Sequence, residues 1–371
     1  MAENTFNPGF KNKAMLLLLW GIVQFSILFT HGINTEGEAL RFIQEANKMD
    51  NLEAFSSPVY FLYLIEILLI YIKLTFSLSF HFIVAIQLIM NLAAVSVFKK
   101  FVDNLYQSEK VSIIATSLLI LCIPYQFFNS YIYTESFFFS LSIIFSCYLL
   151  SRKKITWKEL LIITAGLVLL CITRPTGIFF AGATFVWFFF NVFHSFSIVR
   201  KLSIFFLVML ILLFFVNFIM GNGHGVNVLT PFKAEHVICD VPTIIKQTEI
   251  DANEDNSIIG LVIYILKHPM QFTRLAYLKT LAFFGLNRTY FSFLHNLFTD
   301  TYFYSLYLLI FAGMIQWKKT ELKYFIFHLS LIFIFWMAVV FSCDEWNNRF
   351  FLTLTPFLIL MALPTIQKRL K

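Results

Sequence analysis

Charged residues are scarce in this chain. They make up 13% of its 371 residues, whereas 59% are hydrophobic, and the mean hydropathy is +0.77. Soluble domains carry about 25% charged residues. The composition therefore excludes an ordinary soluble domain and indicates an integral membrane protein. The apolar runs are continuous rather than alternating, which favours membrane-spanning helices and an all-α fold.

Other common features are also missing. The first apolar run, 14–30, lacks a small-residue cleavage site and is predicted to be a retained span rather than a signal peptide. We find no internal repeat and no low-complexity linker, so the sequence predicts one integral membrane domain over 1–371. The five cysteines are scattered and form no metal-binding or redox spacing. No metal site is predicted.

The apolar runs predict about ten spans, since a spanning helix needs roughly 20 mostly apolar residues. Two further segments, 58–75 and 258–290, are apolar but carry ionisable residues, and 221–256 is mainly polar. The ten predicted spans are 14–30, 81–98, 111–128, 136–150, 160–172, 177–193, 202–220, 301–316, 324–341 and 350–365.

The positions of the charges predict the orientation. Lys and Arg near span ends mark the cytoplasmic side. If 58–75 and 258–290 lie along the outer surface as surface or re-entrant helices, the inner joints hold 17 of the 28 Lys and Arg residues and 5 of the 21 acids. If 58–75 crossed instead, the cluster Arg152-Lys153-Lys154 would face outward. We therefore expect both termini in the cytoplasm. The net charge of +7 reflects this orientation and not nucleic-acid binding.

This topology brings several polar joints to the outer face. An acidic loop follows the first span, and a carboxylate cannot stay in hydrocarbon without a cost of several kcal/mol. Each joint has a structural alternative: Arg174 could cap a helix end, Glu135 could be a first-turn acid, and Arg349 could be a snorkelling anchor. Together they predict an outward-facing polar pocket above the bundle. The joints contain Glu36 and Glu38, Tyr133-Thr134-Glu135, Thr173-Arg174-Pro175-Thr176-Gly177, and the segment from Cys343 to Arg349.

These motifs resemble the GT-C class of membrane glycosyltransferases, closest to bacterial relatives of the protein O-mannosyltransferase and lipid A aminoarabinose transferase group, with some likeness to the second GPI mannosyltransferase. The family has aspartate in its first loop, whereas this chain has Glu36-Gly-Glu38. Aligning Phe42 with the family's tyrosine puts Glu38 in the aspartate's place, and Glu36 is the rival. The resemblance is carried by Glu38-x-x-x-Phe42 with Ala46, Pro58-Val-Tyr60, Tyr133 to Phe137, Thr173 to Gly177, Asn348-Arg349-Phe350 and Pro356.

The resemblance implies transfer of a sugar from a polyprenyl-phosphate donor to a glycan, lipid or protein acceptor, with inversion, at the outer face of a bacterial cytoplasmic (inner) membrane. Glu38 or Glu36 would be the general base, and arginines would hold the phosphate. It implies no organic cofactor and leaves room for a divalent cation. Segment 34–79 would be the outer catalytic loop, and 221–300 an outer loop with amphipathic helices beside the membrane lipid. The expected substrate-binding residues are Arg41, Tyr60, Tyr133, Glu135, Arg174, Lys279, Arg288 and Arg349.

Two other classes stay open. A polytopic transporter or flippase would also have many spans, but it would tend to show internal repeats and ionisable residues at mid-membrane. Here Glu66 is the main acid inside an apolar run, and the expected topology places it in a surface helix. A polysaccharide polymerase or ligase would also use outward-facing arginines and lipid-linked glycans.

Overall fold

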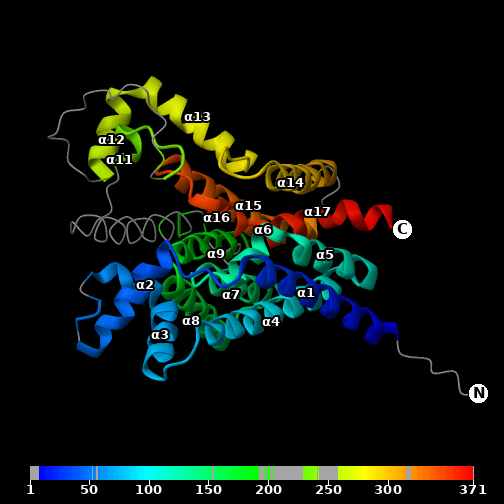
Figure 1. Ribbon diagram of the computed structural model, residues 1–371. Helices are drawn as coiled ribbons and strands as arrows, with labels where there is room; N and C mark the ends of the chain where they lie inside the picture. Colours follow the sequence, from blue (N-terminus) through cyan, green and yellow to red (C-terminus); the bar gives the residue numbers. More distant parts are fainter. Residues whose placement is uncertain are drawn as a thin grey trace, which may run out of the picture.

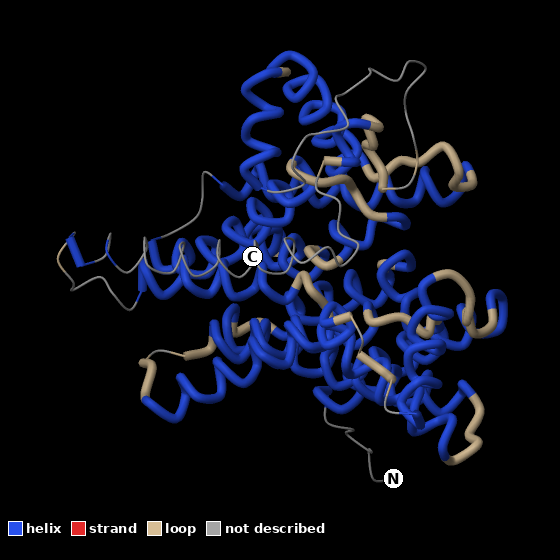
Figure 2. The backbone as a smooth tube through the Cα atoms, turned by 90° about the vertical axis from the view of Figure 1, so that its left-hand side faces the viewer, coloured by secondary structure: helices blue, strands red, loops and turns tan. Residues whose placement is uncertain are grey.

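The computed structural model describes residues 8–51, 53–55, 57–152, 154–191, 197, 199–200, 203, 229–239, 241, 258–314 and 319–370. These residues form helices and loops and contain no β-strand (Figures 1 and 2). The predicted all-α class is therefore confirmed for the part of the chain that is described. Apart from Ser203, the predicted span 202–220 lies outside the described residues, and so does most of 221–256.

The N-terminal half begins with one long helix and a group of short ones. Helix α1 is followed by α2, two 3-10 helices and α3, which together occupy the predicted outer loop. The long helix α4 then leads into a series of bundle helices. The elements of this half are α1 (Pro8–His31), α2 (Glu38–Asn47), η1 (Lys48–Asn51), η2 (Pro58–Tyr63), α3 (Leu64–Thr75), α4 (Phe80–Tyr106), α5 (Glu109–Leu121), α6 (Ile123–Gln126), η3 (Phe127–Ser130), α7 (Glu135–Leu150), α8 (Trp157–Thr173) and α9 (Gly177–Asn191).

In the C-terminal half, three shorter helices precede the two long helices α14 and α15. A bend at η5 and α16 then leads into the last helix. The described elements are α11 (Thr230–Lys233), α12 (Ile258–Lys267), α13 (Pro269–Gly285), α14 (Phe293–Met314), α15 (Lys319–Val340), η5 (Trp346–Asn348), α16 (Arg349–Leu352) and α17 (Thr355–Arg369).

The two halves meet through α15 and α17. Helix α15 packs against α9 and α13, and α17 packs against α5 and α14. Buried apolar side chains from both halves form one continuous core there, to which α17 contributes almost every residue from Phe357 to Leu363. Both termini lie at one end of the bundle, and α2, α3, α11 and α12 lie at the other (Figure 1). The predicted outer segments are thus opposite the termini.

Four helices are long and apolar enough to cross a membrane, and two bent helix pairs raise the number to six among the described residues. The predicted ten spans are therefore not confirmed, although α7, α9 and part of α15 are shorter apolar helices. One bend has a clear cause. Pro124 lies in the first turn of α6, just after the end of α5, and the segments Glu109–Leu121 and Ile123–Ser130 meet at 64°; a proline lacks the backbone N–H that a continuous helix would need at this position.

The two half-apolar segments have different structures. Pro58–Thr75 passes the length and apolarity test for a span, but it is divided into η2 and α3, and α3 runs across the direction of α1 and α4 (Figure 1). Such an orientation is expected of a helix that lies along a surface. The other segment, 258–290, breaks at His268 and Pro269 into α12 and α13, and neither is among the candidate spans.

A disulfide joins Cys239 to Cys343. Backbone hydrogen bonds flank it: the Cys239 amide donates to the Asp344 carbonyl at 2.8 Å, and the Asp344 amide donates to the Val237 carbonyl at 2.8 Å. Disulfides persist in oxidising compartments, which agrees with the expected outer position of this region. The pairing was not predicted from the sequence.

Candidate active site

Arg349 is the centre of a buried ion-pair network. Its Nη1 lies 2.6 Å from Glu38 Oε2 and 2.8 Å from Glu135 Oε1, and its Nη2 lies 3.0 Å from Glu38 Oε1. Nη2 also donates to the Glu345 carboxylate. Arg349 therefore holds Glu38 with both arms of its guanidinium, the arrangement in which arginine binds a carboxylate most strongly.

A second arginine completes the network. Arg174 Nη1 forms an ion pair with the same Glu135 oxygen that contacts Arg349. Glu135 is fully buried, whereas 35% of the Glu38 side chain and 25% of the Glu345 side chain are exposed. We call these five residues (Glu38, Glu135, Arg174, Glu345 and Arg349) the Arg349 cluster. It has a closed side at Glu135 and an open side at Glu38 and Glu345.

Helix ends place the carboxylates of the cluster. Glu38 and Glu135 are the first residues of α2 and α7. The positive end of the helix dipole favours an acid there. Glu135 nevertheless has two arginine partners, so its role exceeds that of the first-turn acid considered from the sequence alone.

Tight turns of the chain position the two arginines of the cluster. Arg174 follows the last residue of α8, and Gly177 begins α9, where a Cβ would overlap the backbone of Leu170 and Cys171. Only glycine lets α9 approach the end of α8 so closely. Before Arg349, Asn347 and Asn348 both have left-handed backbone angles, φ 58° and 57°, which asparagine adopts more readily than most residues. This turn brings Glu345 and Arg349 together.

A glycine also fixes the acidic loop. Gly37 has φ +65°, and a Cβ there would overlap the Tyr133 hydroxyl. That hydroxyl donates to the Glu36 carbonyl at 3.0 Å, and backbone bonds between Asn34, Ser130 and Ile132 add a further tie. The loop is thereby attached to the chain just before Glu135. Tyr133 is thus a positioning residue at the edge of the cluster.

Six of the predicted site residues are not members of the cluster: Tyr133 at its edge, Lys279 and Arg288, which are described below, and Glu36, Arg41 and Tyr60. The side chains of Glu36 and Arg41 are exposed and make no ion pair within the described residues. Tyr60 packs, partly buried, against a small apolar core formed mainly by α2, α3 and α4. The structure therefore brings Glu38, rather than Glu36, to the arginines.

Lys279 and Arg288 are buried, but they have partners elsewhere. Lys279 Nζ donates to the Ser342 carbonyl and lies 4.0 Å from the centre of the Phe232 ring; burial lowers its pKa to about 7. Arg288 pairs with Asp344, whose pKa burial raises to about 6 while the arginine opposes that shift. Both residues hold the segment before Glu345 and do not belong to the cluster.

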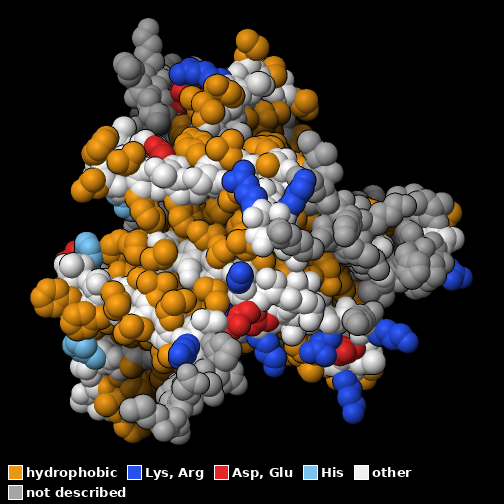
Figure 3. All heavy atoms as spheres, turned by 90° about the vertical axis from the view of Figure 1, so that its right-hand side faces the viewer, with side chains coloured by type: hydrophobic (Ala, Val, Ile, Leu, Met, Phe, Trp, Pro, Cys, Tyr) orange, Lys and Arg blue, Asp and Glu red, His pale blue; other side chains and the backbone are white. Residues whose placement is uncertain are grey.

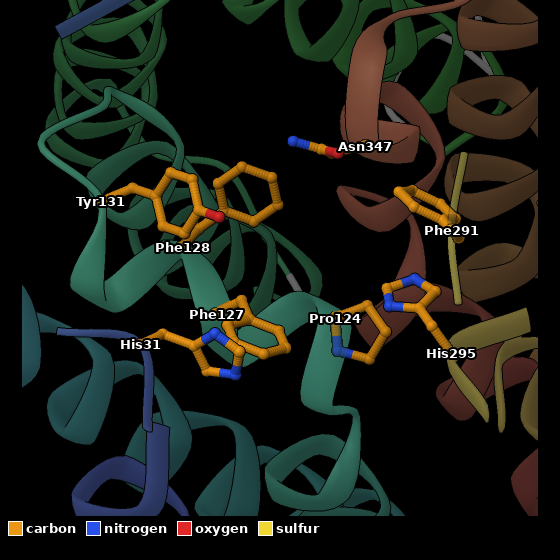
Figure 4. Close-up of a pocket in the computed structure, with 8 residues that line it drawn as sticks. All are labelled: His31, Pro124, Phe127, Phe128, Tyr131, Phe291, His295 and Asn347. Carbon is orange, nitrogen blue, oxygen red and sulfur yellow. The ribbon is translucent and has the colours of Figure 1, made fainter. Parts of the chain in front are cut away.

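A cavity of about 190 Å³ lies between the two halves of the molecule (Figure 4). Two of its lining residues are close in the chain to members of the Arg349 cluster. Figure 4 shows aromatic rings on both sides of it, with His31 beside Phe127 and His295 beside Phe291. It is lined by His31, Pro124, Phe127, Phe128, Tyr131, Phe291, His295 and Asn347. Asn347 precedes Arg349 by two residues, and Tyr131 precedes Glu135 by four.

Three residues near the cluster were missed from the sequence. Glu345 appeared only as part of the polar segment before Arg349, although its i, i+4 spacing to Arg349 is a signal for pairing. The Tyr63 phenol is within electrostatic reach of Arg174, Glu38 and Glu135. Glu66 is 1% exposed, and neither of its carboxylate oxygens has a hydrogen-bond partner in the described structure. No local pattern distinguishes Tyr63 from its apolar neighbours, whereas Glu66 is visible in the sequence as an acid inside an apolar run, but its position near the cluster was not predicted.

Within the described ranges, no group of three or more His, Cys, Asp or Glu side chains is arranged to hold a metal ion. The functional groups of the Arg349 cluster are three carboxylates and two guanidiniums. No family model matches the chain, and neither a curated protein nor a solved structure matches it.

Proposed function

We propose that the protein is an inverting glycosyltransferase that moves a sugar from a polyprenyl-phosphate donor to an acceptor hydroxyl at the non-cytoplasmic face of a bacterial inner membrane. The Arg349 cluster carries this proposal. Four separate segments supply the partly exposed Glu38, the buried Glu135 and two buried arginines, at the end of the bundle opposite the termini. A glycosyl transfer from a lipid phosphate needs these two kinds of group.

The chemistry assigns a role to each. The acceptor oxygen attacks the anomeric carbon while Glu38 takes its proton. The bond from that carbon to the phosphate oxygen breaks, and the lipid phosphate leaves with the electron pair. Arg349 and Arg174 offset the charge that develops on the leaving phosphate. Attack from the side opposite the phosphate inverts the anomeric carbon.

The contacts of Arg349 also suggest an order of events. Without substrate, the cluster holds three carboxylates and two guanidiniums. A donor phosphate must therefore compete with a carboxylate for Arg349. Glu38 and Glu345 are its more exposed partners, so they exchange more readily than Glu135. Displacement of Glu38 by the phosphate would free its carboxylate for the acceptor hydroxyl, coupling donor binding to base activation.

The surroundings fit an amphiphilic donor. The aromatic cavity beside Asn347 offers ring faces and edges to a sugar. Helices α12 and α13 expose large apolar side chains, among them Ile259, Leu266 and Met270, at the same end of the molecule. We assign them to contact with the lipid tail. The sugar and the acceptor are left to experiment.

Purified full-length protein in detergent, incubated with labelled polyprenyl-phosphate sugars and envelope glycan, lipid or peptide acceptors, tests the proposal. We expect labelled product and release of the lipid phosphate. A transporter gives no signal in this assay, because a detergent micelle does not separate two compartments between which a substrate could be moved. Absence of transfer from every donor, together with movement of a lipid-linked sugar across reconstituted vesicles, would refute the transferase and support a flippase.

A further inference from the structure

A second hollow, with a volume of about 630 Å³, lies at the opposite end of the bundle. Its walls are one face of α1 and one face of α4, and Thr116 of α5 also lines it. On α1 the lining residues follow the i, i+3, i+4, i+7 spacing of one helical face. The lining residues are Lys13, Leu16, Leu17, Trp20, Leu92, Val95, Ser96, Lys99, Lys100, Asp103 and Thr116. We call this hollow the α1–α4 groove.

The groove exists because α1 and α4 both pack on α5 while making little contact with each other. One hydrogen bond joins them, from Trp20 Nε1 to Asn91 Oδ1 at 2.8 Å. This bond lies about two helical turns from the lysines along each helix, toward the middle of the bundle. The apolar part of the groove therefore lies between the Trp20–Asn91 hydrogen bond at one end and three lysines, Lys13, Lys99 and Lys100, at the other, which we call the mouth of the groove.

The mouth carries an excess of positive charge. Lys99 is paired with Asp103 at 2.7 Å. Lys13 and Lys100 are exposed, and neither has an ion-pair partner within the described residues. Figure 3 views the molecule from the end where both termini lie, and Lys and Arg side chains outnumber acidic ones over its visible surface. Two lysines at the rim of an apolar groove match a ligand with an anionic head and an apolar tail.

We propose that the α1–α4 groove binds an anionic glycerophospholipid of the surrounding leaflet. The phosphate lies between Lys13 and Lys100, and an acyl chain lies along Leu16, Leu17, Leu92 and Val95. Basic pockets between membrane helices bind anionic head groups in this way. The site is remote from the Arg349 cluster, and the proposal does not depend on glycosyl transfer.

Native mass spectrometry of the full-length protein, delipidated in detergent, tests the assignment. The protein is offered an equal mixture of phosphatidylglycerol and phosphatidylcholine with identical chains. Wild type should retain phosphatidylglycerol preferentially. Since a lysine near a membrane surface contributes about 1 kcal/mol, or roughly five-fold, the double variant Lys13→Gln/Lys100→Gln should lose roughly 30-fold in retention of the anionic lipid.

Two matched variants separate the groove from general charge. Lys154→Gln/Lys158→Gln removes two exposed lysines elsewhere on the predicted inner side and should leave the preference intact. Ser96→Phe fills the groove without changing charge and should weaken retention. Equal retention of both lipids by wild type, or an unchanged preference in the groove double variant, would reduce the groove to an annular lipid contact and overturn the proposal.

Two further arms identify the source of the phosphate. Glycerol phosphate in excess should not displace the bound lipid, because it lacks the chain that fills the groove. Displacement would show that the head group alone is recognised and would contradict the lipid assignment. Stronger retention of polyprenyl phosphate than of phosphatidylglycerol would also contradict it, in favour of the carrier lipid.

Discussion

Two buried arginines near the same end of the molecule differ in how many carboxylates they contact and in how exposed those carboxylates are. Arg288 faces one carboxylate, Asp344, which is fully buried, and it also donates to the Ala282 carbonyl at 3.0 Å. Arg349 faces three carboxylates, of which Glu38 and Glu345 are partly exposed. The functional groups are the same in both places. Access to a second ligand makes Arg349, and not Arg288, the candidate for binding a substrate.

The largest effect is expected at the open side of the Arg349 cluster. Glu38→Gln should lower transfer by about 10²–10⁴-fold, because glutamine keeps the shape of the side chain but cannot take a proton. Initial rates with the labelled donor, alongside donor binding and thermal stability, provide the measurement. Binding and stability should stay close to wild type.

Two controls accompany this variant. Glu36→Gln, in the same loop but exposed and outside the cluster, should have a milder effect, and Glu53→Gln, also exposed, should have none. Inactive Glu36→Gln with active Glu38→Gln would shift the assignment by two residues. Full activity in both would remove the acidic loop from the chemistry.

Changes to the buried Arg288–Asp344 pair should affect the stability of the protein rather than its transfer rate. Arg288→Leu leaves the Asp344 carboxylate buried without its partner and should lower the free energy of unfolding by about 3–5 kcal/mol. Replacing both residues with Leu should recover most of that loss. Thermal unfolding in detergent measures both variants. A stable single variant would show that water or another group reaches Asp344, and the contrast with Arg349 would weaken.

A conservative substitution tests the bidentate contact that the two Nη atoms of Arg349 make with Glu38. Arg349→Lys keeps the charge but cannot hold two carboxylates, or a carboxylate and a phosphate, with fixed geometry. We expect transfer to fall by roughly 10–100-fold, mostly through weaker use of the donor. Arg274→Lys, at an exposed arginine of α13, is the matched control. A wild-type rate in Arg349→Lys would mean that charge alone suffices and that the bidentate contact has no role.

The smallest predicted effect concerns Lys279. Burial lowers its pKa from 10.5 to about 7, so between these values the folded protein binds fewer protons than the unfolded chain. The free energy of unfolding should therefore rise with pH from 7 toward 10.5. Below pH 7 the buried lysine is charged, and it destabilises the folded protein by its full amount. From pH 7 to 8 we expect a gain of about 1 kcal/mol in the free energy of unfolding of the wild type.

The comparison variants for this effect are Lys279→Met and Lys267→Met. Lys279→Met should lose the pH-dependent gain, whereas Lys267→Met, at an exposed position of α12, should follow wild type. Melting temperatures measured at several pH values provide the readout. Parallel curves for wild type and Lys279→Met would mean that the lysine stays charged beneath the Ser342 carbonyl.

Part of the site could be predicted because it depends on where the chain turns. Glu38, Glu135, Arg174 and Arg349 all occur at the ends of apolar runs, and counting the spans placed those ends on one face. The predicted all-α class follows from the same runs. The choice of partners could not be predicted in this way. That Arg288 pairs with Asp344, and Arg349 with Glu38, depends on the packing of α13, α15 and α16, which periodicity does not encode.

The number of spans was also beyond the sequence pattern. An apolar run marks burial in protein or lipid without distinguishing the two, and α17 is almost entirely buried in protein over 355–364. Pro58–Thr75 shows that length and apolarity alone are not decisive. This segment is long and apolar enough to span a membrane, but its helix α3 runs across the direction of α1 and α4. The Cys239–Cys343 pairing joins residues 104 positions apart, and no spacing rule reaches so far.

That covalent link bears on the order in which the molecule is assembled. The segment with Glu345 and Arg349 can be linked to Cys239 only after Cys343, 104 positions later in the chain, has been synthesised, and such a bond forms under oxidising conditions. A growing chain already holds Glu38, Glu135 and Arg174 but lacks their common partner. The cluster is therefore completed only after its other members have been synthesised, and a chain truncated before Arg349 would lack the arginine on which the cluster is centred.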